Sequence, residues 1–213
     1  MSDYQAWFSK TTGGKVVEKL NRNAFNGLYF DTASEATDYI CGQITAGMHV
    51  AFGGSMTVRQ MGIRERAAAL GATLIDHGAN GLSETEKLEV MRSELTSDLF
   101  ISSTNAVTSD GTLVNVDAYG NRVAAMMFGP RKVIIVAGFN KIVQNEKAAF
   151  ARLEQIAGPM NMKRLNRETP CTHDAICHDC RTIARGCRAY TILRRRPAYT
   201  PMDVVIVGEI MGM

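Results

Sequence analysis

Four of the five cysteines in this 213-residue chain lie close together, a pattern typical of a metal or redox site. They are Cys171, Cys177, Cys180 and Cys187, separated by five, two and six residues. Four thiolates can complete a tetrahedral zinc site or ligate an iron–sulfur cluster, and the spacing does not separate the two. A redox-active dithiol at Cys177 and Cys180, or inert thiols, are the alternatives. His173 or His178 could replace one ligand, and the arginines nearby are expected to lower the pKa of the thiols.

A glycine-rich turn, Gly53-Gly54-Ser55-Met56-Thr57, follows an expected strand and opens an expected helix. Such a turn offers free backbone N–H groups, the positive end of a helix dipole and two hydroxyls, which suit a phosphate or a carboxylate. The turn is neither a Walker loop nor a dinucleotide-binding fingerprint. The alternative is a tight turn in which Ser55 or Thr57 only caps the helix.

A third group of polar residues follows the later strands of the expected sheet. It comprises Asn105, Thr108, Asn115, Asp117, Asn121, Arg122, Asn140 and Lys141. Ligands of open α/β sheets bind beyond the carboxyl ends of strands, where Arg122 and Lys141 would supply positive charge and Asp117 an acceptor or base. The alternative is turn chemistry, because Asn and Asp also stabilise turns. No metalloprotease motif or nucleophile elbow is present, and the lone His77 is interpreted as a loop residue.

The elements that must position these residues alternate between short apolar runs and helix-period stretches. Strands are expected at 28–30, 49–52, 73–76, 99–102, 132–137 and 204–207, and helices at 34–45, 58–70, 84–95 and 144–156. Short buried strands that alternate with helices predict an α/β fold, with a mostly parallel sheet covered by helices on both sides.

Two features modify this pattern. Asp110-Gly111 lies between two β-rich runs, so we expect a hairpin that adds an antiparallel part to the sheet, followed by a short helix over 122–127. After about Gly158 the chain becomes proline-punctuated and basic, so residues 159–200 are expected to form an excursion from a single domain over 1–213.

The composition bounds the class of protein. The net charge is only +3, although the segment between Met160 and Arg196 contains nine Lys or Arg and only three Asp or Glu. No known nucleic-acid-binding motif accompanies these charges, so no nucleic-acid partner is expected. The longest apolar run is far below the roughly 20 residues of a membrane span, and the first residues do not resemble a signal peptide. A cytoplasmic location is therefore expected.

Several stretches together resemble the lactate-utilisation (LUD) domain family. They are Gly53-Gly-Ser-Met-Thr57, the run from Asn105 to Asp117, Gly120-Asn-Arg-Val-Ala-Ala125, Gly129 to Val136, Asn140-Lys-Ile-Val143, and the closing Val204–Glu209. Pro170-Cys171 and Cys177-His-Asp-Cys180 are similar to the cysteine stretch of a shorter branch of that family. The family usually has an acid where Gln60 stands and a different pattern around Cys187, which weakens Cys187 as the fourth ligand.

The resemblance implies a fold like that of CoA transferases and ribose-5-phosphate isomerase. It implies a cleft lined by Gly53, Gly54, Ser55, Thr57, Asn105, Asp117, Asn121, Arg122, Asn140 and Lys141, with Asp117 and Lys141 as candidate catalytic groups. It also implies a role beside iron–sulfur oxidase subunits in the oxidation of lactate or a related organic acid. A stand-alone enzyme acting on a sugar phosphate or CoA ester, and a zinc-stabilised structural subunit, are the alternatives.

Overall fold

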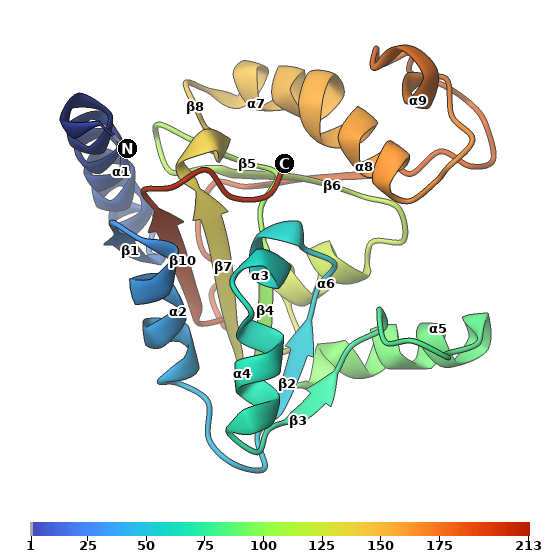
Figure 1. The fold of residues 1–213 in the computed structure, drawn as a ribbon, viewed down its shortest axis with the longest axis horizontal. Helices are drawn as coiled ribbons and strands as arrows, with labels where there is room; N and C mark the ends of the chain where they lie inside the picture. Colours follow the sequence, from blue (N-terminus) through green and yellow to red (C-terminus); the bar gives the residue numbers. More distant parts are fainter. Residues whose placement is uncertain (1) are drawn as a thin grey trace.

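The computed structural model describes residues 2–213 and is built around a six-stranded parallel sheet. In spatial order the strands are β1 (Asn26–Phe30), β10 (Met202–Val207), β7 (Lys132–Gly138), β4 (Leu99–Ser103), β2 (His49–Phe52) and β3 (Thr73–Ile75). Because all six strands run the same way, their carboxyl ends meet at one edge, which lies at the top of Figure 1. The predicted α/β fold with a mostly parallel sheet is confirmed.

Helices cover both faces of this sheet, as the alternating side chains of β7 require. Ile134 and Val136 pack with α2 (Ala33–Cys41), α3 (Met56–Gln60) and α4 (Ile63–Ala69). Val133 and Ile135 point to the other face, which packs with α1 (Asp3–Arg22) and α6 (Asn121–Met127).

The hairpin at Asp110-Gly111 forms as expected, but it belongs to a second sheet. β5 (Ala106–Thr108) and β6 (Leu113–Asp117) pair antiparallel, with Gly111 at φ +82° in the turn. β8 (Ile142–Val143) and β9 (Ala189–Leu193) complete a four-stranded sheet in the order β8-β5-β6-β9. The expectation that the hairpin extends the main sheet is therefore wrong. Figure 1 shows the second sheet across the carboxyl end of the main one.

The helix boundaries differ from the expected ones where glycine or proline intervenes. The helix expected over 58–70 is split into α3 and α4, because Gly62 adopts φ +64° and caps α4. The helix expected over 144–156 starts as α7 (Glu146–Arg152), passes through a π-helical turn at Leu153–Ala157, and continues as α8 (Gly158–Arg164). Pro159 is accommodated near the start of α8, where its missing N–H costs little.

The remaining elements are α5 (Glu84–Ser93), the 3-10 turns Glu94–Thr96 and Phe139–Lys141, and the four-residue α9 (Cys171–Asp174). The expected excursion over 159–200 thus includes most of α8, all of α9, and β9 of the second sheet. Within residues 2–213, no helix combines the length and the apolar character that crossing a bilayer requires.

Candidate functional site

Lys141 is the buried centre of a polar site at the carboxyl edge of the main sheet. It follows β7, and only 5% of the residue is exposed. Its Nζ donates hydrogen bonds to Thr57 Oγ1 after β2 and to Ser103 Oγ at the end of β4, both at 2.8 Å. Three neighbouring strands therefore bring these groups together, as the parallel topology predicts for their carboxyl ends.

The surroundings of Lys141 are positively charged. Burial, followed by the charges of Arg152 and Arg122, lowers the pKa of Lys141 from 10.5 to about 7. Among residues 2–213, no carboxylate forms an ion pair with Lys141. A buried ammonium group whose partners are two hydroxyls is poised to accept an anion.

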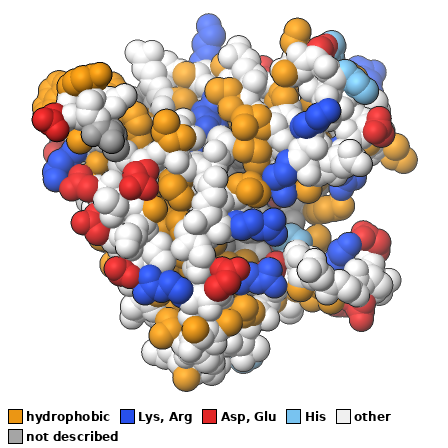
Figure 2. All heavy atoms as spheres, in the orientation of Figure 1, with side chains coloured by type: hydrophobic (Ala, Val, Ile, Leu, Met, Phe, Trp, Pro, Cys, Tyr) orange, Lys and Arg blue, Asp and Glu red, His pale blue; other side chains and the backbone are white. Residues whose placement is uncertain are grey.

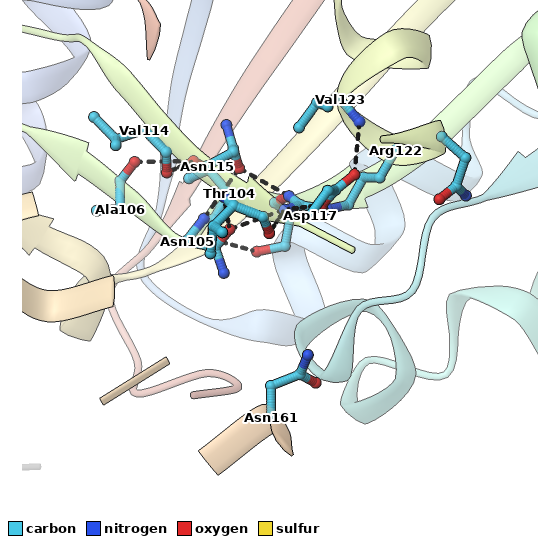
Figure 3. A network of polar contacts seen from close by, with 12 residues as sticks. Thr104, Asn105, Ala106, Val114, Asn115, Asp117, Arg122, Val123 and Asn161 are labelled. Atoms are coloured by element: carbon cyan, nitrogen blue, oxygen red, sulfur yellow. Dashed lines mark hydrogen bonds and ion pairs between the residues drawn. The ribbon is translucent and has the colours of Figure 1, made fainter. Parts of the chain in front are cut away.

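Arg122 holds the second sheet, β4 and α6 together through hydrogen bonds from its whole guanidinium group (Figure 3). Its Nε donates to Asp117 Oδ1 at 2.9 Å, and its Nη1 donates to the carbonyl of Ser103 at 2.7 Å. Further acceptors are Asn115 Oδ1, Asn105 Oδ1 and the carbonyl of Val116. Since its donors have protein partners, Arg122 acts on Lys141 through its charge, and its direct contact with a ligand stays a prediction.

Asp117 is engaged in the same network. Its Oδ1 accepts from Arg122, and its Oδ2 accepts from the backbone N–H of Val123 at 3.0 Å, which fixes the first turn of α6. The carboxylate therefore has a positioning role in this arrangement. Its role as a catalytic base stays a prediction.

Arg152 is a second buried cation that the sequence did not single out. It lies on α7 and donates to the main-chain carbonyls of Asn105 and Asn140, at 2.7 and 3.2 Å. Its Nη2 donates to the carbonyl of Met213 at 2.7 Å. Burial lowers the pKa of Arg152.

The segment after β10 crosses this site. The N–H of Met211 donates to Asn140 Oδ1 at 2.9 Å, and the N–H of Gly212 donates to Gln60 Oε1 at 2.7 Å. A Cβ on Gly212 would lie 2.4 Å from Thr57 Oγ1 and 3.2 Å from Lys141 Nζ, so the chain can pass this close only as glycine. Gln60, which stands where the family usually has an acid, is used here to hold this segment.

In the glycine-rich turn, Gly53 and Ser55 have structural roles, whereas Gly54 is loosely surrounded. A Cβ on Gly53 would meet Ser102 Oγ at 2.5 Å, so Gly53 is needed for packing against β4. Ser55 caps α3 by accepting a hydrogen bond from the N–H of Val58, the capping role that the sequence left open for it. At Gly54 the position of a missing Cβ is 3.9 Å from Nε2 of His77, which places that ring beside the turn.

His77 is a functional candidate that the sequence interpretation assigned to a loop. Its Nδ1 lies 2.5 Å from Oε1 of Glu94, a fully buried carboxylate whose other oxygen accepts from Asn121 Nδ2 at 3.1 Å. The hydrogen bond to Glu94 raises the pKa of His77 above 6.5. Its position in the sequence could have indicated a role in the site, since His77 follows β3 at the edge where the other site residues gather.

The predicted site residues therefore gather in one region. Ser103 is the common partner of Lys141, Arg122 and Thr57. Arg152 donates hydrogen bonds to the main-chain carbonyls of Asn105 and Asn140 beside them. His77 lies beside Gly54 and contacts Glu94, and Glu94 accepts a hydrogen bond from Asn121. Figure 2 shows that the molecule is hollowed between α5 and the part carrying α8 and α9, with basic and histidine side chains nearby.

The four clustered cysteines lie apart from Lys141 and share one cavity, which we call the cysteine hollow. Cys171, Cys177, Cys180 and Cys187 all line it, together with His178, and all are free thiols. Cys187 thus joins the other three despite the unusual sequence around it. His178 Nε2 is bound to Asp174 Oδ2 at 2.7 Å, and His173 is not among the lining residues.

The thiol chemistry differs from the expectation at Cys187. Burial raises the pKa of this thiol, and the neighbouring cysteines, Cys177 first among them, raise it further. Arg185 acts in the opposite direction with a smaller effect. Arg185 therefore lowers the pKa of Cys187 as predicted, but burial and the neighbouring thiols outweigh it, so the net shift is upward.

The sequence and the structure were compared with those of known proteins. No curated protein matches the sequence. A solved structure of a DUF162 family protein from Deinococcus radiodurans is similar to the chain, with TM-score 0.52 and 13% identity over 93% of this chain and 98% of that one. The eIF2B beta and delta structures from Chaetomium thermophilum match at TM-scores of 0.36 and 0.38, with 18% and 15% identity, over 53% and 56% of this chain and 42% and 50% of theirs.

The family comparison covers nearly the whole chain. The LUD domain matches residues 14–207, which include the main sheet, the Lys141 site and the four clustered cysteines. The chain therefore belongs to the LUD domain family.

Proposed function

We propose that the chain binds a small organic acid at Lys141 and serves a lactate-utilisation-related reaction. The observation that carries the proposal is the buried Lys141 ammonium, whose hydrogen bonds go to Thr57 and Ser103 while Arg152 and Arg122 add positive charge. A carboxylate at this position would supply the missing negative charge. Its binding would raise the pKa of Lys141, since an opposite charge favours the protonated form.

The ligand would reach Lys141 where the segment Met211–Met213 now crosses the site. The main chain of that segment forms single hydrogen bonds with the side chains of Asn140, Gln60 and Arg152, while the Met211 side chain is anchored in the core. The hydrogen bond from Arg152 to the Met213 carbonyl is the contact that a carboxylate oxygen would replace most directly. We therefore expect the ligand to displace Gly212 and Met213, with Met211 staying in the core, rather than to enter a preformed cavity.

Calorimetric titration with lactate, pyruvate, a sugar phosphate and a CoA ester tests the proposal. We expect pyruvate or lactate to bind, and Lys141→Met to weaken binding at least about tenfold, the loss of about 1.4 kcal/mol expected for a charge-assisted contact. Lys147→Met, on the exposed side of α7, removes an equal charge away from the site and should bind like the unaltered protein.

The other outcomes are equally informative. Binding of only the sugar phosphate or the CoA ester, lost in Lys141→Met, would favour the stand-alone enzyme acting on those substrates. Equal affinity of Lys141→Met and Lys147→Met for every ligand would refute Lys141 as the anchor. Cooperation with iron–sulfur oxidase subunits is part of the same proposal and rests on the resemblance to the lactate-utilisation family alone.

A second candidate function, acid–base catalysis by this chain itself, is favoured by the His77–Glu94 pair. Glu94 is buried and orients Nδ1 of His77, while Nε2 faces the turn at Gly54 whose other end reaches Lys141 through Thr57. Such a pair can take a proton from the carbon next to a carbonyl, with the C–H electrons forming an enolate that Lys141 stabilises.

Exchange of the methyl protons of pyruvate in heavy water, followed by NMR, tests this second candidate without any partner protein. The chain should accelerate the exchange, and His77→Gln, which keeps a hydrogen-bonding side chain, should remove the acceleration. Binding of pyruvate without accelerated exchange would restrict the site to ligand binding.

A further inference from the structure

We propose that the loop between α9 and β9 is a docking surface for an acidic partner protein, whose carboxylates enter a recess lined by Arg181, Arg185 and Arg188. We call this recess the arginine recess. The proposal deepens the proposed function, on which it rests for the expectation of a partner protein. Neither Lys141 nor any group bound by the cysteines takes part in it.

Three guanidinium groups line one open recess in this loop. Arg181, Arg185 and Arg188 surround it together with Ile183. Among the ion pairs within residues 2–213, a single one involves these arginines, between Arg185 Nη1 and Asp179 Oδ1 at 2.7 Å. Positive charge therefore exceeds negative charge at the recess. Guanidinium groups present several N–H donors to carboxylates, so the recess suits acidic side chains.

The main chain of the loop holds two of these arginines in place. Arg188 Nε and Nη2 donate to the carbonyls of Arg185 and Ile183, at 2.9 and 2.8 Å. Arg185 Nε and Nη1 donate to the carbonyls of Cys187 and Cys180, at 2.6 and 2.7 Å. Because these side chains are already ordered, binding a partner costs less side-chain entropy than it would with mobile arginines.

The residue types around the recess favour a protein over a nucleic acid. Ile183, which lines the recess, is 95% exposed, and Ile176 of the same loop is also exposed. Between Met160 and Arg196, eight of the nine basic residues are arginine. Protein interfaces are enriched in arginine and depleted of lysine. Nucleic-acid binding without base readout depends on phosphate contacts, to which an exposed isoleucine adds nothing.

The position of the recess places the partner beside the cysteine hollow. Cys180 and Arg185 line both the hollow and the recess. In Figure 1 the part carrying α8 and α9 lies on the other side of the molecule from α1. Figure 2 shows basic, histidine and apolar side chains side by side on this part. A partner protein seated at the recess would therefore lie beside the four thiols and away from α1.

Fluorescence anisotropy with labelled synthetic peptides and the full chain tests the proposal. The probe is a peptide of glutamates with interspersed leucines, and its control has lysines in place of the glutamates. We expect saturable binding of the probe alone at low salt, weakened by added salt. Arg181→Gln combined with Arg188→Gln should weaken binding at least about fivefold, and Arg181→Gln by itself should show part of that loss.

A matched pair of substitutions controls for the loss of charge. Lys15→Gln combined with Arg22→Gln removes the same charge from exposed positions of α1 and should bind the probe like the unaltered chain. Far-ultraviolet circular dichroism establishes that each variant is folded. Absence of saturable probe binding, or equal affinity of the two double variants for the probe, would overturn the proposal.

Ile183→Ser separates protein docking from attraction by charge alone. The unaltered chain should bind the probe more tightly than a peptide of glutamates alone, and Ile183→Ser should remove this difference. Ile183 is almost wholly exposed, so its replacement leaves the core unchanged. A DNA duplex that binds more tightly than the probe, with no effect of Ile183→Ser, would overturn the proposal in favour of a nucleic acid.

Two further measurements distinguish the remaining occupants and the proposed function. Self-association of the unaltered chain in analytical ultracentrifugation, lost in Arg181→Gln with Arg188→Gln, would assign the recess to a second copy of the chain and overturn the acidic partner. Pyruvate titration of the same samples separates the two sites. Pyruvate binding without probe binding would refute the docking surface alone, whereas probe binding without pyruvate binding would refute the Lys141 proposal alone.

Discussion

Lys141 is the residue whose placement is hardest to explain by stability alone. Removing an ammonium group from water disfavours its charged form, and here burial brings the pKa of Lys141 down to about 7. Hydroxyl groups from Thr57 and Ser103 replace only part of its hydration. Residues that carry such a cost are characteristic of binding and catalytic sites.

Replacing this lysine should therefore stabilise the free protein, and the gain should depend on pH. Between pH 7 and pH 10.5 the unfolded chain keeps the lysine proton that the folded chain has lost, so the stability of the unaltered protein rises with pH in that window. Lys141→Met lacks this dependence. Its advantage in the free energy of unfolding should be on the order of a few kcal/mol below pH 7 and nearly absent by pH 10.5.

Urea unfolding of both proteins at pH 6.5 and pH 10 measures this difference, with Lys147→Met as the control for a lost surface charge. The account requires the difference to shrink as the pH rises. A difference that is constant with pH, or that grows, would show that Lys141 is not a destabilised cation in the folded protein.

Residues at strand ends could be predicted from the sequence, whereas their partners could not. Lys141, Asn140 and Thr57 follow apolar runs that read as buried strands, so their position at the sheet edge was accessible. Arg152 is the last residue of α7, and a basic side chain on a helix usually faces solvent. Only the packing of α7 against the second sheet turns it inward, toward the carbonyl of Asn105.

The His77–Glu94 pair shows the same limit. His77 and Glu94 are separated by the whole of α5, and nothing in the local pattern couples them. Their contact depends on the path of the chain between β3 and β4. A buried glutamate at the end of a polar helix is visible only when the tertiary structure is known.

At the scale of the elements, α1 is the helix that sequence patterns did not indicate. Its middle contains Gly13 and Gly14, which disfavour helix and weaken the signal. The structure explains only one of them. A Cβ on Gly13 would lie 2.5 Å from two ring carbons of Tyr29, while nothing lies within 4 Å of a Cβ on Gly14. Gly13 is thus required for α1 to approach β1.

The two glycines give a matched test of this packing. Gly13→Ala should destabilise the protein by about 1–3 kcal/mol, because the methyl group forces the Tyr29 ring or α1 to shift. Gly14→Ala should stabilise it by up to about 1 kcal/mol, the helix propensity gain with no steric cost. Chemical denaturation of both variants checks the prediction. Equal effects of the two substitutions would contradict the close approach of α1 to Tyr29.

Local sequence patterns predict only part of the second sheet. The Asp110-Gly111 pair predicts the turn between β5 and β6 correctly, since the turn needs a residue with positive φ and Gly111 supplies it. Their partners β8 and β9 are contributed by residues 142–143 and 189–193, far along the chain. The break between α3 and α4 at Gly62 is likewise a matter of a single glycine within an otherwise helical pattern.

At the scale of the whole molecule, one edge of the parallel sheet collects the chemistry. The second sheet lies across this edge, and α7 continues through the π-helical turn into α8. Arg152, which belongs to the Lys141 site, is followed directly by Leu153, which lines the cysteine hollow. The Lys141 site and the cysteine hollow are therefore connected by consecutive residues of the chain.

The protonation of Lys141 is the measurement that tests the account most directly. NMR of protein labelled at the lysine side chains, with Lys141→Met to assign the signal, should show one lysine titrating near pH 7 rather than near 10.5. Saturating pyruvate should raise that pKa, because the carboxylate stabilises the ammonium form. A Lys141 signal that titrates near 10.5, or whose pKa does not change when pyruvate binds, would contradict the buried cation as the ligand's anchor.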